Sequence, residues 1–222
     1  MPAGNPSIAP PPGYGLIGPR HQLGRRLPRL VAGLVLCGVG IALTVNADLG
    51  LGPWDVLHQG ISKLTGVPIG TVGILVGAVL LISWIPLRER PGIGTITNVI
   101  LIGATVDIVL LWLPQPDHLA ARVAFLVVGV FLFGPGSGLY IGAGLGPGPR
   151  DGLMTSIARR GPTVRLVRTL IELTALALGV VLGGTVGAGT VLFALTIGPN
   201  VQFFLPIFAV DRHPPPTAAE IG

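Results

Sequence analysis

The stretch that decides the fold is ADLGLGPWDVLHQGI, residues 47–61, because it returns as AGLGPGPRDGLMTSI at residues 143–157. Eight of the 15 positions are identical at a shift of 96 residues, and the shared core reads Leu-Gly-x-Gly-Pro-x-Asp. The similarity continues on both sides: Gly33, Gly38 and Gly40 match Gly129, Gly134 and Gly136, and Gly92, Gly94 and Gly103 match Gly187, Gly189 and Gly198. The pattern predicts a duplicated unit of about 95 residues, an arrangement found in many membrane transporters.

Composition indicates that the chain lies in lipid. Half of the residues are hydrophobic, 10% are charged and the mean hydropathy is +0.78, whereas a soluble domain carries roughly a quarter charged residues. The single Cys37 excludes an intramolecular disulfide and a cysteine-based metal site. The net charge of +5 comes from arginines that flank hydrophobic segments, so it predicts membrane orientation and not nucleic-acid binding.

The predicted fold is all-α, a polytopic transmembrane bundle of about six spans with two short re-entrant or interfacial half-helices. A spanning helix needs about 20 apolar residues. Six stretches approach that length, at residues 29–46, 67–87, 93–113, 121–142, 163–183 and 188–209, and the half-helices cover residues 53–65 and 149–160. The expected organisation is a disordered Pro/Gly-rich tail (1–28), a first repeat (29–120), a second repeat (121–209) and a disordered tail (210–222). Residues 25–47 imitate a signal peptide, but they match part of the second repeat and are therefore interpreted as a span.

The direction of the repeats follows from the number of spans. With three spans per copy, the second copy enters the membrane from the opposite side, so the repeat is inverted. Placing both termini in the cytoplasm puts 12 of the 14 basic residues on that side, with Lys63 and Arg122 outside. A parallel repeat with eight spans places 11 of the basic residues on the cytoplasmic side and three outside. Charge alone barely separates the two arrangements, and the shortness of the half-helices favours the inverted one.

The Gly-rich turns before the half-helices are the first candidate binding site. Gly50 and Gly52 precede one helix, and Gly146 and Gly148 precede the other. Free amides and the positive dipole end of such a half-helix suit an anion or a carboxylate. Asp55 and Asp151 fall in the first turns of these helices. They either stabilise the free amides or take part in binding a ligand or coupling ion, and both readings stay open.

Glu172 and its neighbour Arg168 form the second candidate. Glu172 lies near the middle of the predicted fifth span, where an ionisable group is costly and usually faces a cavity or a partner. Arg168 lies one turn earlier, so a structural ion pair and a substrate or proton site are both possible. His58 follows Asp55 by one turn and is a further candidate for binding the solute, but its counterpart is Met154, and we expect no metal site.

Weaker candidates are polar residues that could line a cavity or join helices by hydrogen bonds. They are Asn46, Gln59, Asn98, Asp107 and its counterpart Gln202. The sequence shows no nucleophile–base pair, metal cluster or nucleotide-binding fingerprint, so we expect neither an enzyme nor a cofactor.

At this point a family resemblance is visible. The runs Gly50-Leu-Gly-Pro-Trp-Asp-Val-Leu-His-Gln-Gly60 and Gly146-Pro-Gly-Pro-Arg-Asp-Gly-Leu-Met154, the latter followed by Arg168 and Glu172, resemble the YczE/YyaS/YitT-like group of bacterial integral membrane proteins. The resemblance covers residues 29–209. It implies an α-helical, multi-pass protein of the bacterial cytoplasmic membrane, and it implies no reaction and no catalytic residue.

Two functions are compatible with these observations. The first is a transporter of a small solute, an anion or an amino-acid-like molecule, whose site near the membrane midplane is built by the two half-helices. The second is a membrane scaffold that regulates a partner enzyme or a secretion system without transporting anything. A homodimer is plausible, because a bundle of this size can need a second copy to enclose a pathway.

Overall fold

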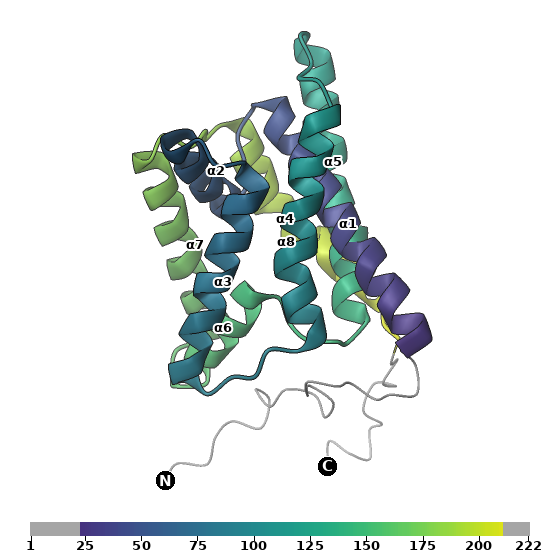
Figure 1. Cartoon of the computed structure of the whole chain (residues 1–222), viewed down its shortest axis with the longest axis vertical. Helices are drawn as coiled ribbons and strands as arrows, with labels where there is room; N and C mark the ends of the chain where they lie inside the picture. The colour runs from purple at the N-terminus through teal and green to yellow at the C-terminus, as the bar shows by residue number, and fades with distance from the viewer. Residues whose placement is uncertain (1–22, 211–222) are drawn as a thin grey trace.

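The computed structural model describes residues 23–210, and within them it shows eight helices without a strand (Figure 1). Their bounds are α1 Leu23–Ala47, α2 Pro53–Thr65, α3 Ile69–Leu87, α4 Ile93–Trp112, α5 Leu119–Gly142, α6 Pro149–Ala158, α7 Val164–Val181 and α8 Ala188–Phe208. The predicted all-α membrane bundle is confirmed. Most of the two predicted tails lies outside the described residues.

Five helices, α1, α3, α4, α5 and α8, are long and apolar enough to cross a membrane. The predicted fifth span, residues 163–183, corresponds to α7, which has 18 residues but is not among these five. The reason is that α7 carries three charged side chains, Arg165, Arg168 and Glu172. The helix exists where the sequence predicts it, and its charges reach its middle at Glu172, whereas the three arginines of α1 lie close to its first residue.

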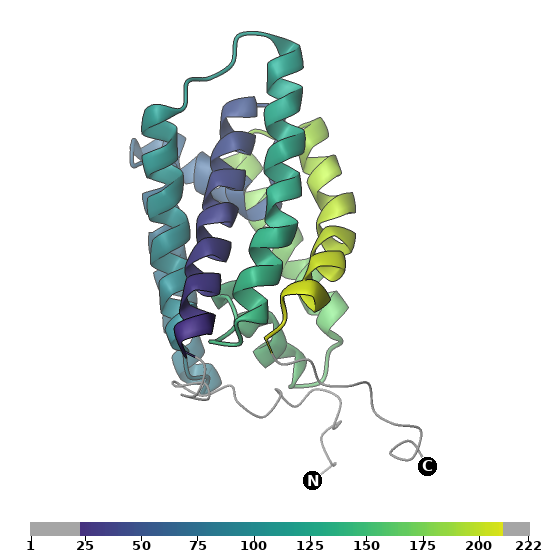
Figure 2. The same ribbon diagram turned by 90° about the vertical axis from the view of Figure 1, so that its right-hand side faces the viewer.

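The two short helices lie at opposite ends of the bundle (Figure 1). With 13 and 10 residues, α2 and α6 extend about 20 and 15 Å, too short to cross about 30 Å of hydrocarbon. The long helices α1 and α5 lie side by side and run in opposite directions, with α4 against α1 and α8 against α5 (Figure 2). The short lengths of α2 and α6 contradict the eight-span alternative, in which both helices would cross the membrane.

Glycines allow α1 and α5 to cross with their backbones in contact. A Cβ atom at Gly33 would lie 2.6 Å from the carbonyl oxygen of Gly136, and one at Gly129 would lie 2.6 Å from that of Gly40. Gly33 corresponds to Gly129 in the sequence alignment of the halves, and Gly40 corresponds to Gly136. Each half therefore contributes the same two small residues to the crossing, and no larger side chain fits there.

The turns before the short helices are held by the opposite half. The N–H of Gly94 donates to the carbonyl oxygen of Leu145 at 2.8 Å, and the N–H of Gly189 donates to that of Leu49 at 2.8 Å. Gly94 and Gly189 are among the first residues of α4 and α8, whose N–H groups have no partner within their own helix. These two hydrogen bonds join the halves reciprocally, at corresponding positions.

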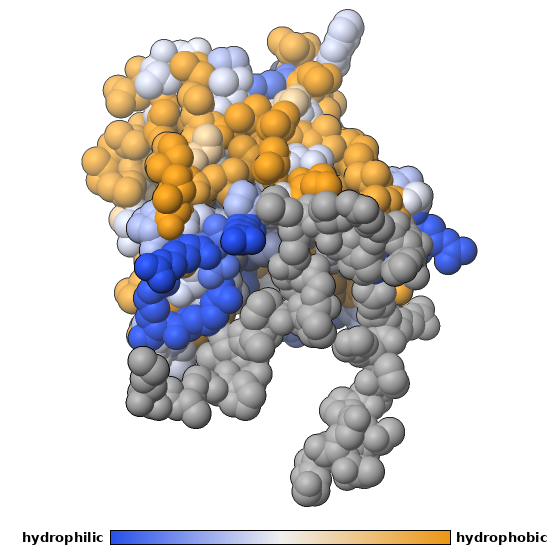
Figure 3. All heavy atoms as spheres, turned by 60° about the horizontal axis from the view of Figure 1, so that its bottom comes forward, coloured by the Kyte–Doolittle hydropathy of each residue, from blue (hydrophilic) through white to orange (hydrophobic). Residues whose placement is uncertain are grey.

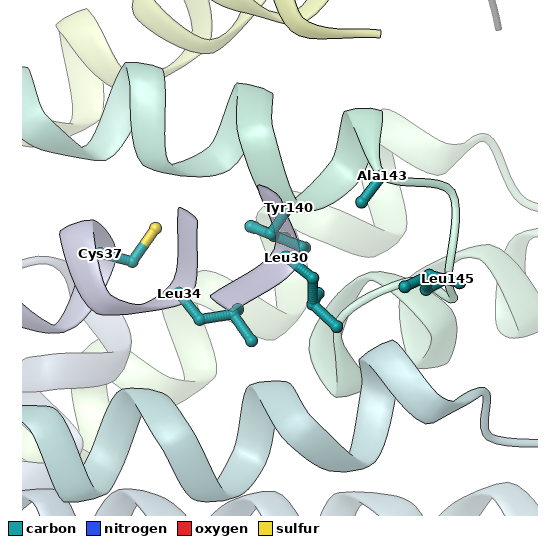
Figure 4. Close-up of a cluster of buried hydrophobic side chains, with 6 residues drawn as sticks. All are labelled: Leu30, Leu34, Cys37, Tyr140, Ala143 and Leu145. Atoms are coloured by element: carbon teal, nitrogen blue, oxygen red, sulfur yellow. The ribbon is translucent and has the colours of Figure 1, made fainter. Parts of the chain in front are cut away.

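A buried apolar cluster packs α1 against α5 and the turn before α6 (Figure 4). It contains Leu30, Leu34, Cys37, Tyr140, Ala143 and Leu145. Beside it, Nη1 of Arg26 donates to the carbonyl oxygen of Ala143 at 2.9 Å. Helix α1 begins at Leu23, six residues before the predicted start, and it includes Pro28. The hydrogen bond between Arg26 and Ala143 stabilises these six additional residues of α1 by a tertiary contact. A local sequence pattern does not reveal such a contact.

The sides of the bundle are apolar. Large hydrophobic side chains such as Leu111 (81% exposed), Val181 (83%) and Leu195 (71%) point outward, which is stable only in contact with lipid. Hydrophilic residues gather at one end of the molecule, below the apolar sides (Figure 3). Contacts of Arg29 with the end of α8, and of Arg159 with Glu89, lie at this end, which we call the Arg-rich end. Lys63 and Arg122 bind backbone carbonyls at the opposite end.

Candidate functional site

A cavity of about 520 Å³ lies where the two halves meet. The first residues of α2 and of α6 both line it, although these helices enter from opposite ends of the bundle. Helices α1, α3, α4, α5, α7 and α8 contribute the rest of the wall. The cavity is of the size that small-molecule sites occupy.

Both short helices present their N-termini to this cavity. Gly52 and Gly148 are the N-cap residues, and no side chain caps either helix. Proline follows each cap and removes one N–H group, but the next amides still have no intrahelical partner. Two positive dipole ends therefore converge on one space, as the sequence predicts.

Trp54 and Arg150 meet at the centre of the site. They occupy the same position, x, in the two Gly-Pro-x-Asp motifs. The Arg150 guanidinium lies over the Trp54 ring, 4.8 Å from its centroid, in a cation–π arrangement. Trp54 is 9% exposed, and its Nε1 has no hydrogen-bond partner among residues 23–210. The two halves thus place a cation and an unpaired donor next to each other.

His58 adds a second unpaired polar atom. Its Nδ1 lies 3.6 Å from Oδ1 of Asp55, and both side chains are buried. Its Nε2 is buried without a partner in the described part of the chain, and the residue lines the cavity. Leaving a buried polar atom unpaired costs about 1–3 kcal/mol. The cavity wall therefore holds groups that a bound molecule can satisfy.

Two further carboxylates have one partner each. The Tyr140 hydroxyl donates to Oδ2 of Asp151 at 3.2 Å. Nε of Arg168 donates to Oε1 of Glu172 at 2.9 Å. All four side chains line the cavity, and their second oxygens and remaining N–H groups are left for other contacts. The wall therefore offers both positive and negative charge to a ligand.

The structure brings most of the sequence-predicted site residues together. The residues that line the cavity are Gly52, Asp55, His58, Gly148, Asp151, Arg168, Glu172, Asn98 and Gln202. Gly50 and Gly146 do not line it. They shape the turns behind it, with φ of +106° and +127°, a conformation that only glycine adopts at low cost.

Three predicted cavity residues bind backbone elsewhere. Nδ2 of Asn46 donates to the carbonyl oxygen of Leu113 at 2.7 Å. Oε1 of Gln59 accepts from the N–H of Thr185 at 2.6 Å. Asp107 accepts from the first amides of α3. These polar side chains fasten helix ends and loops, so they lie outside the cavity wall.

Trp54, Arg150 and Tyr140 are site residues that the sequence prediction omitted. Trp54 and Arg150 carried a signal, because they fill the variable position of the repeated Gly-Pro-x-Asp motif. Tyr140 carried none, since its hydroxyl reaches Asp151, 11 residues later, only through the path of the turn between α5 and α6. Within residues 23–210, no three His, Cys, Asp or Glu side chains are grouped so as to hold a metal ion.

Comparison with known proteins gives relatives along most of the chain. An uncharacterised protein of Haemophilus influenzae is 42% identical over 187 residues, covering 84% of this chain and 86% of its own length. The uncharacterised membrane protein YczE of Bacillus subtilis is 37% identical over 191 residues, covering 84% and 88%. The uncharacterised protein YyaS of the same organism is 29% identical over 188 residues, covering 82% and 92%. No solved structure matches the chain.

The resemblance to YczE and YyaS is thereby confirmed, and YczE is itself described as a membrane protein. The chain also matches a family of unknown function, DUF6198, over residues 24–206. The match includes both short helices and every residue of the cavity wall. The protein is a multi-pass membrane protein that belongs to this family.

Proposed function

We propose that this protein transports a small solute that carries charge of both signs, such as an amino acid, and binds it in the cavity between α2 and α6. The observation that carries the proposal is the convergence of two half-helix N-termini on buried polar atoms without partners, Trp54 Nε1 and His58 Nε2. A solute that hydrogen-bonds to them removes a cost that the empty protein bears.

The charges of the wall favour a zwitterion over an ion of one sign. A solute carboxylate matches the Arg150 guanidinium and the free amides of the half-helices. A solute ammonium matches Asp151 and Glu172, which each have an oxygen without a hydrogen bond among the described residues. A simple anion satisfies only the first set of contacts.

The inverted arrangement supports movement across the membrane. We propose that the chain consists of two inverted copies of one unit, with the site at the interface between them, as in several transporter folds. The role is non-enzymatic in this proposal, with no cofactor. The location is the bacterial cytoplasmic membrane, with the Arg-rich end toward the cytoplasm, because basic residues prefer that side.

The first test is a thermal-unfolding screen of the purified protein in detergent. The panel contains neutral amino acids, dicarboxylates, phosphate esters and polyamines. A zwitterion present at a hundred times its Kd adds about 2.7 kcal/mol to the free energy of unfolding, a shift of roughly 5–10 °C in Tm. Asp151→Asn and Glu172→Gln should abolish this shift while the protein stays folded.

Gln59→Ala is the matched control. Gln59 lies outside the cavity and binds the N–H of Thr185, so its removal should lower the starting Tm and leave the ligand-induced shift intact. Uptake of the stabilising solute into proteoliposomes then tests transport itself. If no compound shifts the Tm, and the Asp151 and Glu172 variants behave like wild type, the proposal fails and the scaffold function becomes the better explanation.

A further inference from the structure

The two halves differ in one contact. Helix α3 packs along α4, whereas α7 and α8, their counterparts, are not packed along each other anywhere in residues 23–210. Residues of the first half correspond to residues 95 positions later in the second half. The N-cap residues of the helices follow this rule: Pro68 of α3 corresponds to Thr163 of α7, and Gly92 of α4 corresponds to Gly187 of α8.

The packed side of α3 is made of glycine, and the same positions of α7 are charged. Gly70, Gly73 and Gly77 correspond to Arg165, Arg168 and Glu172. A Cβ at Gly70 would lie 2.0 Å from the carbonyl oxygen of Gly103, so α3 and α4 touch through their backbones. At the corresponding positions α7 carries long charged side chains, of which Arg168 and Glu172 line the cavity.

A glycine on α8 is left without the neighbour that its counterpart has. Gly103 is packed so tightly that an added Cβ would lie 2.4 Å from the carbonyl oxygen of Gly70. Its counterpart Gly198 has no atom within 4 Å of such a Cβ in the described structure, and it lines the cavity. The surface of α8 that corresponds to the α3–α4 contact therefore faces open space.

The polar residues beside these glycines differ in the same way. Asp107 accepts hydrogen bonds from Gly70 and Thr71 at the start of α3. Its counterpart Gln202 is exposed and has no hydrogen bond among the described residues. The charged residues in place of glycines, the open space beside Gly198 and the missing partner of Gln202 all lie where α7 and α8 would touch if they packed as α3 and α4 do.

We propose that α7 and α8 form the gate of the solute site, and that they close by adopting the packing that α3 and α4 have here. The inference rests on the proposed function, since it assigns the gate of that same site. Residues 165–172 lie in the half of α7 nearest the Arg-rich end, so in this proposal the cavity opens toward that end. Residues 70–77 lie in the half of α3 nearest the opposite end, where the α3–α4 contact closes the cavity.

The charged residues couple this gate to the solute. Arg168 and Glu172 line the cavity and also occupy the positions that must approach α8. A solute with charge of both signs offsets their charges as the helices close, so it binds the closed state more tightly and shifts the population toward it. The second state opens the α3–α4 contact, because inverted halves exchange roles in alternating access.

Disulfide crosslinking in membrane vesicles tests the gate without any ligand. All variants carry Cys37→Ala, which removes the native cysteine. The reference pair is Gly77→Cys with Val99→Cys, because a Cβ at Gly77 lies 3.4 Å from the Val99 Cβ, close to the spacing of a disulfide. The corresponding test pair is Glu172→Cys with Ala194→Cys. A second test pair, Thr169→Cys with Gly198→Cys, corresponds to Ile74 and Gly103 and leaves Arg168 and Glu172 in place.

We expect the reference pair and both test pairs to crosslink on mild oxidation. A further variant carries cysteines at positions 77 and 99 and also at positions 169 and 198. Because the two contacts alternate, each molecule of this variant should form one of the two disulfides and not both. Crosslinking of the reference pair alone overturns the gate and shows a permanent opening, and both disulfides in one molecule exclude alternation. A reference pair that fails to crosslink contradicts the closed α3–α4 contact on which the inference stands. Since no ligand is used, these outcomes are separate from failure of the solute proposal in the thermal screen.

Discussion

Replacing Asp107 by alanine should destabilise the protein far more than the same change at its counterpart Gln202. The two oxygens of Asp107 accept from the N–H of Gly70 at 2.6 Å, and from the N–H and hydroxyl of Thr71 at 2.7 Å each. Asp107 thus caps the start of α3 from a neighbouring helix. Gln202 makes no such contact within the residues that the structure describes.

The magnitude follows from these three bonds. Hydrogen bonds to a charged group are worth about 1.5–3 kcal/mol each, and loss of a helix N-cap costs about 0.5–2 kcal/mol. The values do not add fully, because Thr71 is only partly buried and water can form the hydrogen bonds that Thr71 loses. The N–H of Gly70 is buried, so water does not replace its hydrogen bond. We expect Asp107→Ala to lower the free energy of unfolding by about 2–3 kcal/mol, and Asp107→Asn by about half as much, since one oxygen acceptor remains.

The assay is equilibrium unfolding by SDS in mild detergent micelles, followed by far-ultraviolet circular dichroism. Gln202→Ala should stay within about 0.5 kcal/mol of wild type, as a surface substitution does. An Asp107→Ala variant as stable as wild type would refute the assignment of Asp107 to the α3 cap. Equal losses for both variants would refute the difference between the two halves.

Two further predictions concern glycines and use the same unfolding assay. Gly152→Ala should lower the free energy of unfolding by about 1–3 kcal/mol through overpacking, because the new Cβ would lie 2.1 Å from the buried Trp84 ring. Gly198→Ala should be neutral or stabilising by up to about 1 kcal/mol, because its Cβ would have no atom within 4 Å. Gly50→Ala should be more damaging than Gly66→Ala: both have positive φ and incur a strain of about 1–2 kcal/mol, but only at Gly50 would the Cβ meet backbone, 2.5 Å from the Gly187 nitrogen. Equal stabilities within either pair would contradict the packing described here.

Local signals were sufficient to predict most of the helices. Helix α2 runs from Pro53 to Thr65, the predicted range, because a Gly-Pro start and the left-handed Gly66 at its end are both encoded in a few residues. The start of α1 was predicted too late, since Pro28 suggested a tail and the contact of Arg26 with Ala143 links residues 117 apart in sequence.

The site was less predictable, because a polar residue in an apolar segment does not reveal what it faces. Asp107 and Gln202 occupy corresponding positions, and one caps a helix while the other lines the cavity. Which of these happens depends on whether the neighbouring helix is packed against it. The packing of neighbouring helices is set by the assembled halves, and a local sequence pattern does not predict it.

The exchange of hydrogen bonds between Gly94 and Leu145, and between Gly189 and Leu49, has a consequence for biogenesis. The first half leaves the ribosome with the Leu49 carbonyl oxygen lacking its partner, and that partner is the start of the last helix. Because α8 lines the cavity, the cavity is completed only when α8 has been inserted. Separately expressed halves should each be short-lived in the membrane, and they should co-purify as a stable complex when they are made in the same cell.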